Sequence, residues 1–139
     1  MGSFEGKKTV LIDASVILRY LLGDDEKLYQ RAEELFDAVA TGELKVFIPT
    51  LAVAEVVYTL EKLYGVNRKL IAGTLLELMR FRNVLTENKQ LLLRTLELYD
   101  ATDMDFSECL LCAYSKYYDL LSFDPKLEKC TAGGMDKSS

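Results

Sequence analysis

Apolar residues along the chain follow two spacings, which predict strands alternating with helices. Short apolar runs at 8–13, 44–49, 82–86 and 119–124 predict strands. Longer segments with apolar residues three or four positions apart predict helices at 14–23, 24–42, 50–65, 67–81, 87–102 and 105–118, and a short helix starts at Pro125. This order is typical of an α/β protein whose central parallel sheet is covered by helices on both faces.

Helix boundaries can be read from capping residues. Thr50 and Asn67 are expected to cap the helices that follow them, because short polar side chains accept hydrogen bonds from free backbone amides. Gly23, Gly42 and Gly65 are expected to end helices.

The length of 139 residues fits one domain, which we place at 8–129, with 1–7 and 130–139 as flexible or vector-derived ends. No apolar run is long enough to span a membrane, and the N-terminus does not resemble a secretory signal. Three cysteines do not suggest a disulfide framework, so we expect a cytoplasmic protein. Cys109 and Cys112 are three positions apart in a predicted helix, which favours core packing over a metal or redox site.

The absence of histidine restricts the chemistry. It excludes a Ser-His-Asp triad, a Cys-His pair and zinc sites that need imidazole. The net charge of −5 argues against nonspecific binding to nucleic acid, unless clustered acids bind divalent cations and reverse the local charge.

Five acidic residues are candidates for such a cluster. Asp13 and Asp124 end predicted strands, although either could simply cap the next helix. Glu55 carries the only charge between Thr50 and Leu60, and its alternative is an exposed stripe of the helix. Asp105 and Glu108 have the spacing of a capping box, and the alternative is that one or both of them face the same strand ends as Asp13.

The five acidic residues taken together indicate a metal site more strongly than any one of them does alone. Carboxyl ends of parallel strands share one edge, where ligands bind in α/β sheets. Oxygen ligands suit Mg²⁺ or Mn²⁺, and such ions activate water and stabilise the leaving oxygen in phosphodiester hydrolysis.

Four segments resemble the PIN domain family, the metal-dependent ribonuclease fold of VapC-type toxins. They are "VLIDASVILRYLLGDDE", "IPTLAVAEVVYTLEK", "DFSECLLCAYSK" and "DLLSFDPKLEK". The resemblance implies a three-layer α/β/α fold with a central parallel sheet. It also implies an endoribonuclease that uses Mg²⁺ or Mn²⁺, an RNA substrate, an antitoxin partner and a homodimer.

Residue by residue, the resemblance places Asp13, Glu55 and Asp124 at family acidic positions. Glu108 falls where the family usually has aspartate, and Asp105 matches a less regular acid one turn earlier. Ser15 and Ser122 fall where the family often has small polar residues that hold a water or orient a carboxylate, although Ser15 could instead cap its helix and Ser122 lie in a strand.

RNA binding requires cations near this edge. The candidates are Arg19, Lys62, Arg68, Lys69, Lys116 and Lys126, each of which could equally be ordinary solvated surface. Glu108 in place of aspartate leaves open a PIN-like module that binds RNA or a protein without cutting it. A third reading, with Asp13 as a nucleophile, ranks last because no second aspartate follows two residues later.

Overall fold

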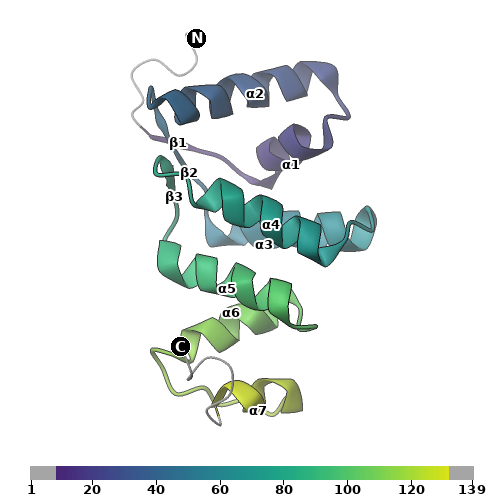
Figure 1. Cartoon of the computed structure of the whole chain (residues 1–139), viewed down its shortest axis with the longest axis vertical. Coiled ribbons are helices and arrows are strands. Elements are labelled where there is room, and N and C mark those ends of the chain that lie inside the picture. Colours follow the sequence, from purple (N-terminus) through teal and green to yellow (C-terminus); the bar gives the residue numbers. More distant parts are fainter. Residues whose placement is uncertain (1–8, 132–139) are drawn as a thin grey trace.

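The protein is described by a computed structural model, which covers residues 9–131. The strands are β1 (Thr9–Leu11), β2 (Lys45–Phe47) and β3 (Val84–Leu85). The helices are α1 (Ala14–Leu22), α2 (Glu26–Thr41), α3 (Thr50–Tyr58), α4 (Arg68–Met79), α5 (Lys89–Ala101), α6 (Phe106–Tyr114) and α7 (Pro125–Thr131), and the π-helical η2 (Thr59–Leu63) continues α3. The predicted α/β class, with helices around a parallel sheet, is confirmed. Figure 1 shows α1 and α2 at one end of the molecule and α6 and α7 at the other.

The three strands form one parallel sheet in the order β1-β2-β3. Leu11 pairs with Phe47, and Phe47 pairs with Leu85, so all three strands end at the same edge. Between residues 9 and 131 no strand pairs with the other side of β1. The sheet therefore has a free edge next to Leu11, whose side chain is 70% exposed.

The strand predicted at 119–124 is wrong. These residues connect α6 to α7 without regular structure, and Leu121 and Phe123 are 83% and 95% exposed. Their apolar character favours a strand, but a strand also needs a partner. Here α7 packs against α6, far along the molecule from β1 (Figure 1), so the segment has no strand to pair with.

The core is built from the inner faces of the helices and from β2. Side chains without exposed surface include Ile17, Val46, Ile48, Val53, Val56, Leu75, Met79, Leu96 and Tyr99. Two cations donate to backbone carbonyls at helix ends and in the segments that follow them, where intrahelical donors are absent. Arg68 donates to the carbonyls of Tyr99, Thr102 and Met104 at 2.8, 3.0 and 2.6 Å. Lys89 donates to the carbonyl oxygens of Met79, Phe81 and Val84.

Most of the predicted helix ends are confirmed. Asn67 accepts hydrogen bonds from two backbone amides of α4, and Gly23 and Gly42 end α1 and α2 with φ of 61° and 86°. Thr50 is not a cap, because α3 begins after Pro49 without a side-chain cap. Instead the carboxylate of Glu87 accepts hydrogen bonds from the Thr50 amide and hydroxyl at 2.8 and 2.9 Å.

Two of the cysteines form a disulfide, contrary to our expectation. Cys112 in α6 and Cys130 in α7 are bonded, and both are buried. Cys109 and Cys112 are close in the sequence and share one helix, whereas Cys130 is brought close to Cys112 only by the packing of α7 on α6. Cys109 is a buried free thiol, as expected, and burial raises its pKa to about 11. The domain limit at residue 129 stays a prediction, although α7 runs to Thr131.

Reduction of the disulfide is expected to destabilise the protein. It closes a separation of 18 residues, and loop-closure entropy of that size corresponds to about 3 kcal/mol. Urea unfolding with and without dithiothreitol measures the change. The Cys112→Ala/Cys130→Ala variant is the control and should not respond to the reductant. Equal stability of the wild type under both conditions would contradict the bond.

Candidate functional site

Asp13 and Glu55 line the same hollow beside the end of β1. The hollow has a volume of about 460 Å³, and its lining residues are Leu11, Ile12, Asp13, Val16, Pro49, Leu51, Ala52 and Glu55. We call it the Asp13 hollow. Asp13 stands between β1 and α1, and Glu55 projects from α3, which follows β2. The two carboxylates thus come from the segments that follow two neighbouring parallel strands.

Asp13 is held in a fixed position by Ser15. Its Oδ1 accepts hydrogen bonds from the Ser15 amide at 3.0 Å and from the Ser15 hydroxyl at 2.6 Å, so Asp13 is the N-cap of α1. The hydroxyl bond, followed by backbone hydrogen bonds, holds the pKa of Asp13 below its ordinary value. The serine is therefore not the cap itself but orients the carboxylate.

Glu55 lies on an exposed stripe of α3, although most of its neighbours in the sequence are apolar. Its neighbours Val53, Val56 and Val57 face the core, while Glu55 lies on the outer side of α3 and faces the hollow. The position of α3 depends on Glu87, which binds the amide and hydroxyl of Thr50. Burial alone would raise the pKa of Glu87, but the hydrogen bonds, led by the one from the Thr50 backbone, outweigh it and lower the pKa.

Sequence reasoning missed Glu87. It follows the strand at β3, as Asp13 follows β1, so its place after a predicted strand was the available signal. It is not among the residues that line the Asp13 hollow. Its role in the structure is to hold the start of α3.

Asp105 and Glu108 do not join the hollow, and form a capping box at the start of α6. The Glu108 amide donates to Asp105 at 2.9 Å, and the Asp105 amide donates to Glu108 at 3.0 Å. Asp105 instead lines a separate hollow with Glu61 and Lys62.

Asp124 and Ser122 also lie away from the hollow. Asp124 accepts a hydrogen bond from the Lys126 amide at 2.9 Å, and its own amide donates to the Ser122 hydroxyl at 3.0 Å. Ser122 therefore does not lie in a strand. Both residues belong to the connection before α7.

The Asp13 hollow offers a divalent cation two carboxylates, those of Asp13 and Glu55. Within residues 9–131 no group of three or more acidic or cysteine side chains is placed to hold a metal ion. Mg²⁺ is often bound by one or two carboxylates and several waters, and Asp13 and Glu55 supply oxygen ligands of this kind. The donor set of the hollow fits such an ion.

Several of the predicted RNA-binding cations are occupied in other contacts. Arg19 pairs with Asp24 at 2.9 Å, and Lys69 pairs with Asp100 at 3.4 Å. Arg68 donates to the three carbonyls at and after the end of α5 that are described above. A second hollow, of about 610 Å³, lies on the other side of β1 against α2. We call it the α2 hollow, and Arg19 and Arg31 are among its lining residues.

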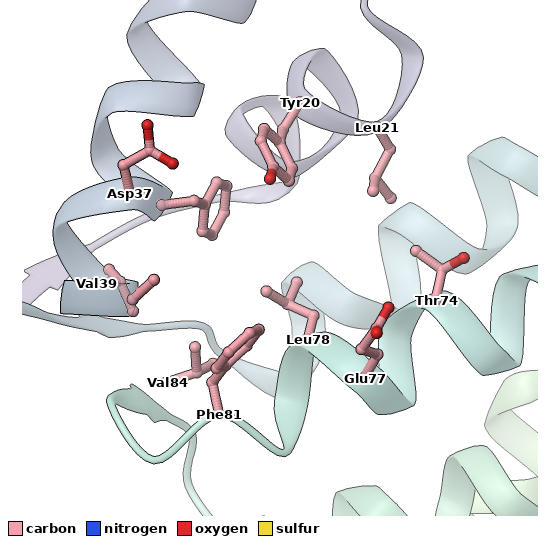
Figure 2. A pocket seen from close by; sticks show the side chains of 11 residues that line it. Tyr20, Leu21, Asp37, Val39, Thr74, Glu77, Leu78, Phe81 and Val84 are labelled. Carbon is pink, nitrogen blue, oxygen red and sulfur yellow. The ribbon is translucent and has the colours of Figure 1, made fainter. Parts of the chain in front are cut away.

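Another hollow lies between α1, α2 and α4 (Figure 2). Tyr20 and Leu21 of α1 face Leu78 and Phe81 across it. The acids at its rim, Asp37 and Glu77, come from different helices. Its lining is mainly apolar, which suits a peptide better than a phosphate.

The sequence matches one protein family over nearly its whole length. The profile described as PIN domain matches residues 10–132. The chain belongs to the PIN domain family. A "VapC ribonuclease" of Aquifex aeolicus (strain VF5) is similar to this PIN domain, with 26% identity over 122 residues, 86% of this chain and 90% of the relative. No solved structure matches the chain significantly.

Ser15→Ala is expected to raise the pKa of Asp13 toward its ordinary value, because the carboxylate loses its hydroxyl donor. The low pKa in the folded state contributes stability at pH values above the ordinary pKa, and this contribution is lost as the pH falls through the folded pKa. NMR titration of the Asp13 carboxyl carbon measures the shift. Ser107→Ala removes the equivalent bond to Asp105 and should leave the Asp13 pKa unchanged. An unchanged pKa in Ser15→Ala would count against this hydrogen bond.

Asp105→Ala is expected to lower the free energy of unfolding by about 1 kcal/mol, the usual effect of losing a helix N-cap. The response of the melting temperature to Mn²⁺ should stay as in the wild type. Glu108→Gln, which retains capping ability, should change neither quantity. A lost Mn²⁺ response in either variant would place that residue at the metal instead.

Proposed function

We propose that this PIN domain is a Mg²⁺- or Mn²⁺-dependent endoribonuclease whose centre is the pair Asp13 and Glu55. The observation that carries the proposal is their meeting in one open hollow at the ends of two parallel strands. The similarity to a VapC ribonuclease supports RNA as the substrate. Asp124, Glu108 and Asp105 match family acidic positions by resemblance, but all three lie outside the hollow, so the proposed centre does not include them.

A bound divalent cation would supply Lewis acid chemistry for phosphodiester hydrolysis. The chain's own residues prepare for this in three ways. Ser15 keeps Asp13 charged and oriented through its hydroxyl. Glu55 provides a second carboxylate on a helix that is fixed at its start by Glu87. Exposed Leu11 and Leu51 flank the acids and offer apolar surface to a nucleobase of a single-stranded substrate.

By the same similarity, we propose that the protein is the toxin of a cytoplasmic toxin–antitoxin pair. None of the helices in the described part of the chain is long and apolar enough to cross a membrane. The apolar hollow of Figure 2 offers an antitoxin helix or strand a surface that includes Leu78 and Phe81. A homodimer is proposed as well, and the apolar faces of the helices at 26–40 and 50–64 and the segment 75–81 are its candidate surfaces.

The second candidate function is a PIN domain that binds RNA or a protein without cutting it. The observation in its favour is the capping box, which engages Glu108 with the backbone of its own helix. Asp124 also lies outside the hollow, so only Asp13 and Glu55 of the candidate acids line it. The family resemblance implies four acids at the site.

Asp13→Asn is expected to abolish Mn²⁺-dependent cleavage of single-stranded RNA, with at least a hundredfold loss of rate, because the substitution removes a charged ligand. Asp25→Asn is the matched control, since Asp25 caps α2 with a similar hydrogen bond outside the hollow. Gel analysis of a labelled RNA measures the rate, and EDTA should stop it.

Cleavage by the wild type in EDTA, or by Asp13→Asn at the wild-type rate, would contradict the nuclease mechanism. Binding of RNA by the wild type without cleavage would favour the second candidate function.

A further inference from the structure

We propose that the α2 hollow is a nucleotide-binding subsite, which holds the nucleotide of a single-stranded RNA next to the phosphate at the Asp13 hollow. Arg31 of α2 binds a phosphate of this nucleotide, and the apolar wall of the hollow receives its base. The position of the RNA rests on the proposed nuclease function, whereas binding to the α2 hollow is measured without cleavage, so the two can fail separately.

The first observation is that the two hollows lie on either side of the open edge of β1. Leu11, Ile12 and Val16 line both of them, so these residues form the wall between the hollows. Ser15 also lines the α2 hollow, and its hydroxyl donates to Asp13, which lines the other hollow. An extended RNA strand that crosses Leu11, whose side chain is 70% exposed, therefore passes from one hollow directly into the other.

The backbone at this edge offers hydrogen bonds to a base. The Ile12 amide donates to Phe47 of β2, and successive residues of a strand direct their N–H and C=O groups to opposite sides. The N–H and C=O of Leu11 therefore point away from β2, where no strand pairs with them within residues 9–131. One donor and one acceptor thus stand between the two hollows, and a few polar groups of this kind orient a ligand that apolar contacts hold.

The second observation is the difference in charge between the hollows. The lining residues of the Asp13 hollow include two acids and no cation, whereas Arg19 and Arg31 line the α2 hollow. Arg19 is paired with Asp24, but Arg31 is exposed and has no ion pair in the described part of the chain. Glu34 is the single acid of the α2 lining, and Lys27, one helical turn before Arg31, offsets its charge. The α2 hollow therefore supplies the cations for RNA that the Asp13 hollow lacks.

The third observation is the shape and polarity of the α2 hollow. Its volume of about 610 Å³ lies within the range of about 300–1,000 Å³ that is usual for small-molecule sites. Leu28, Ala32 and Leu35 form an apolar wall, and every base has a flat face that such a wall can cover. A nucleotide carries a phosphate and this face in one unit. An acidic peptide satisfies the arginine, but needs a further apolar side chain to fill the hollow, so RNA is the better fit.

Fluorescence anisotropy in EDTA, with a labelled oligouridylate of about ten nucleotides, tests the subsite without cleavage. Arg31→Gln is expected to weaken binding about tenfold, as the loss of one charge-assisted hydrogen bond does. It should also lower the slope of log affinity against log NaCl by about 0.7, the value for one phosphate contact with a single strand. Arg82→Gln is the matched control, because Arg82 is exposed and lines neither hollow. A wild type that does not bind, or an Arg31→Gln variant that binds as tightly, would overturn the proposal.

Leu28→Ala tests the contact with the base. Leu28 is 40% exposed, and its truncation is expected to weaken binding about threefold without changing the salt slope, because apolar contact is lost and charge is not. Leu63→Ala is the control, since Leu63 is 70% exposed on η2, outside both hollows. Unchanged binding by Leu28→Ala would contradict the contact. A polyglutamate peptide that displaces the labelled RNA as readily as unlabelled RNA does would assign the hollow to an acidic peptide and overturn the proposal.

Cleavage kinetics separate the subsite from the proposed nuclease function. With Mn²⁺, Arg31→Gln is expected to raise KM for the same oligonucleotide about tenfold at nearly unchanged kcat, because it removes binding that ground state and transition state share. Arg31-dependent binding by a wild type that does not cleave would remove the nuclease function and leave the subsite standing. Cleavage that depends on Asp13, with the wild-type KM in Arg31→Gln, would overturn the subsite and leave the nuclease function standing.

Discussion

The parallel register of β1 and β2 is the constraint on which the candidate site depends. Because Leu11 pairs with Phe47, the chain leaves both strands at one edge, and Asp13 comes close to the start of α3. The hydrogen bond from the Ile12 amide to the Phe47 carbonyl, 3.1 Å long, carries the pairing up to Asp13 itself. Glu55 reaches the same hollow because α3, which carries it, starts at this edge of the sheet. A shift of one residue would turn Asp13 to the other face of the sheet.

Carboxylates at this edge have two functions that reinforce each other. Asp13 caps α1 and faces the hollow, and Glu87 binds the start of α3 while it follows β3. The partial positive charge of a helix N-terminus stabilises a carboxylate in its charged form. Asp13 is therefore the N-cap of α1, as one of the two interpretations of the sequence predicted, and this role is compatible with metal binding. For Asp105 and Glu108 the capping box explains their positions, and neither lines the Asp13 hollow.

The local features could be predicted from the sequence, and the long-range ones could not. Apolar spacing predicted the three strands and every helix, and the Asp-x-x-Glu spacing predicted the capping box. Spacing could not predict the partner of Thr50, which is Glu87 from 37 residues away, or the bond between Cys112 and Cys130. Both contacts depend on how whole elements pack. The strand expected at 119–124 failed for the same reason, because strand formation requires a neighbour that sequence periodicity does not specify.

The Cys112–Cys130 bond determines where Asp124 lies in the molecule. It fixes α7 to α6 and thereby holds Asp124 away from the Asp13 hollow of its own chain. The apolar residues that precede Asp124 remain almost fully exposed, while the edge of β1 stays open. In a monomer both surfaces are costly to leave in water, since they add apolar area and unpaired backbone groups.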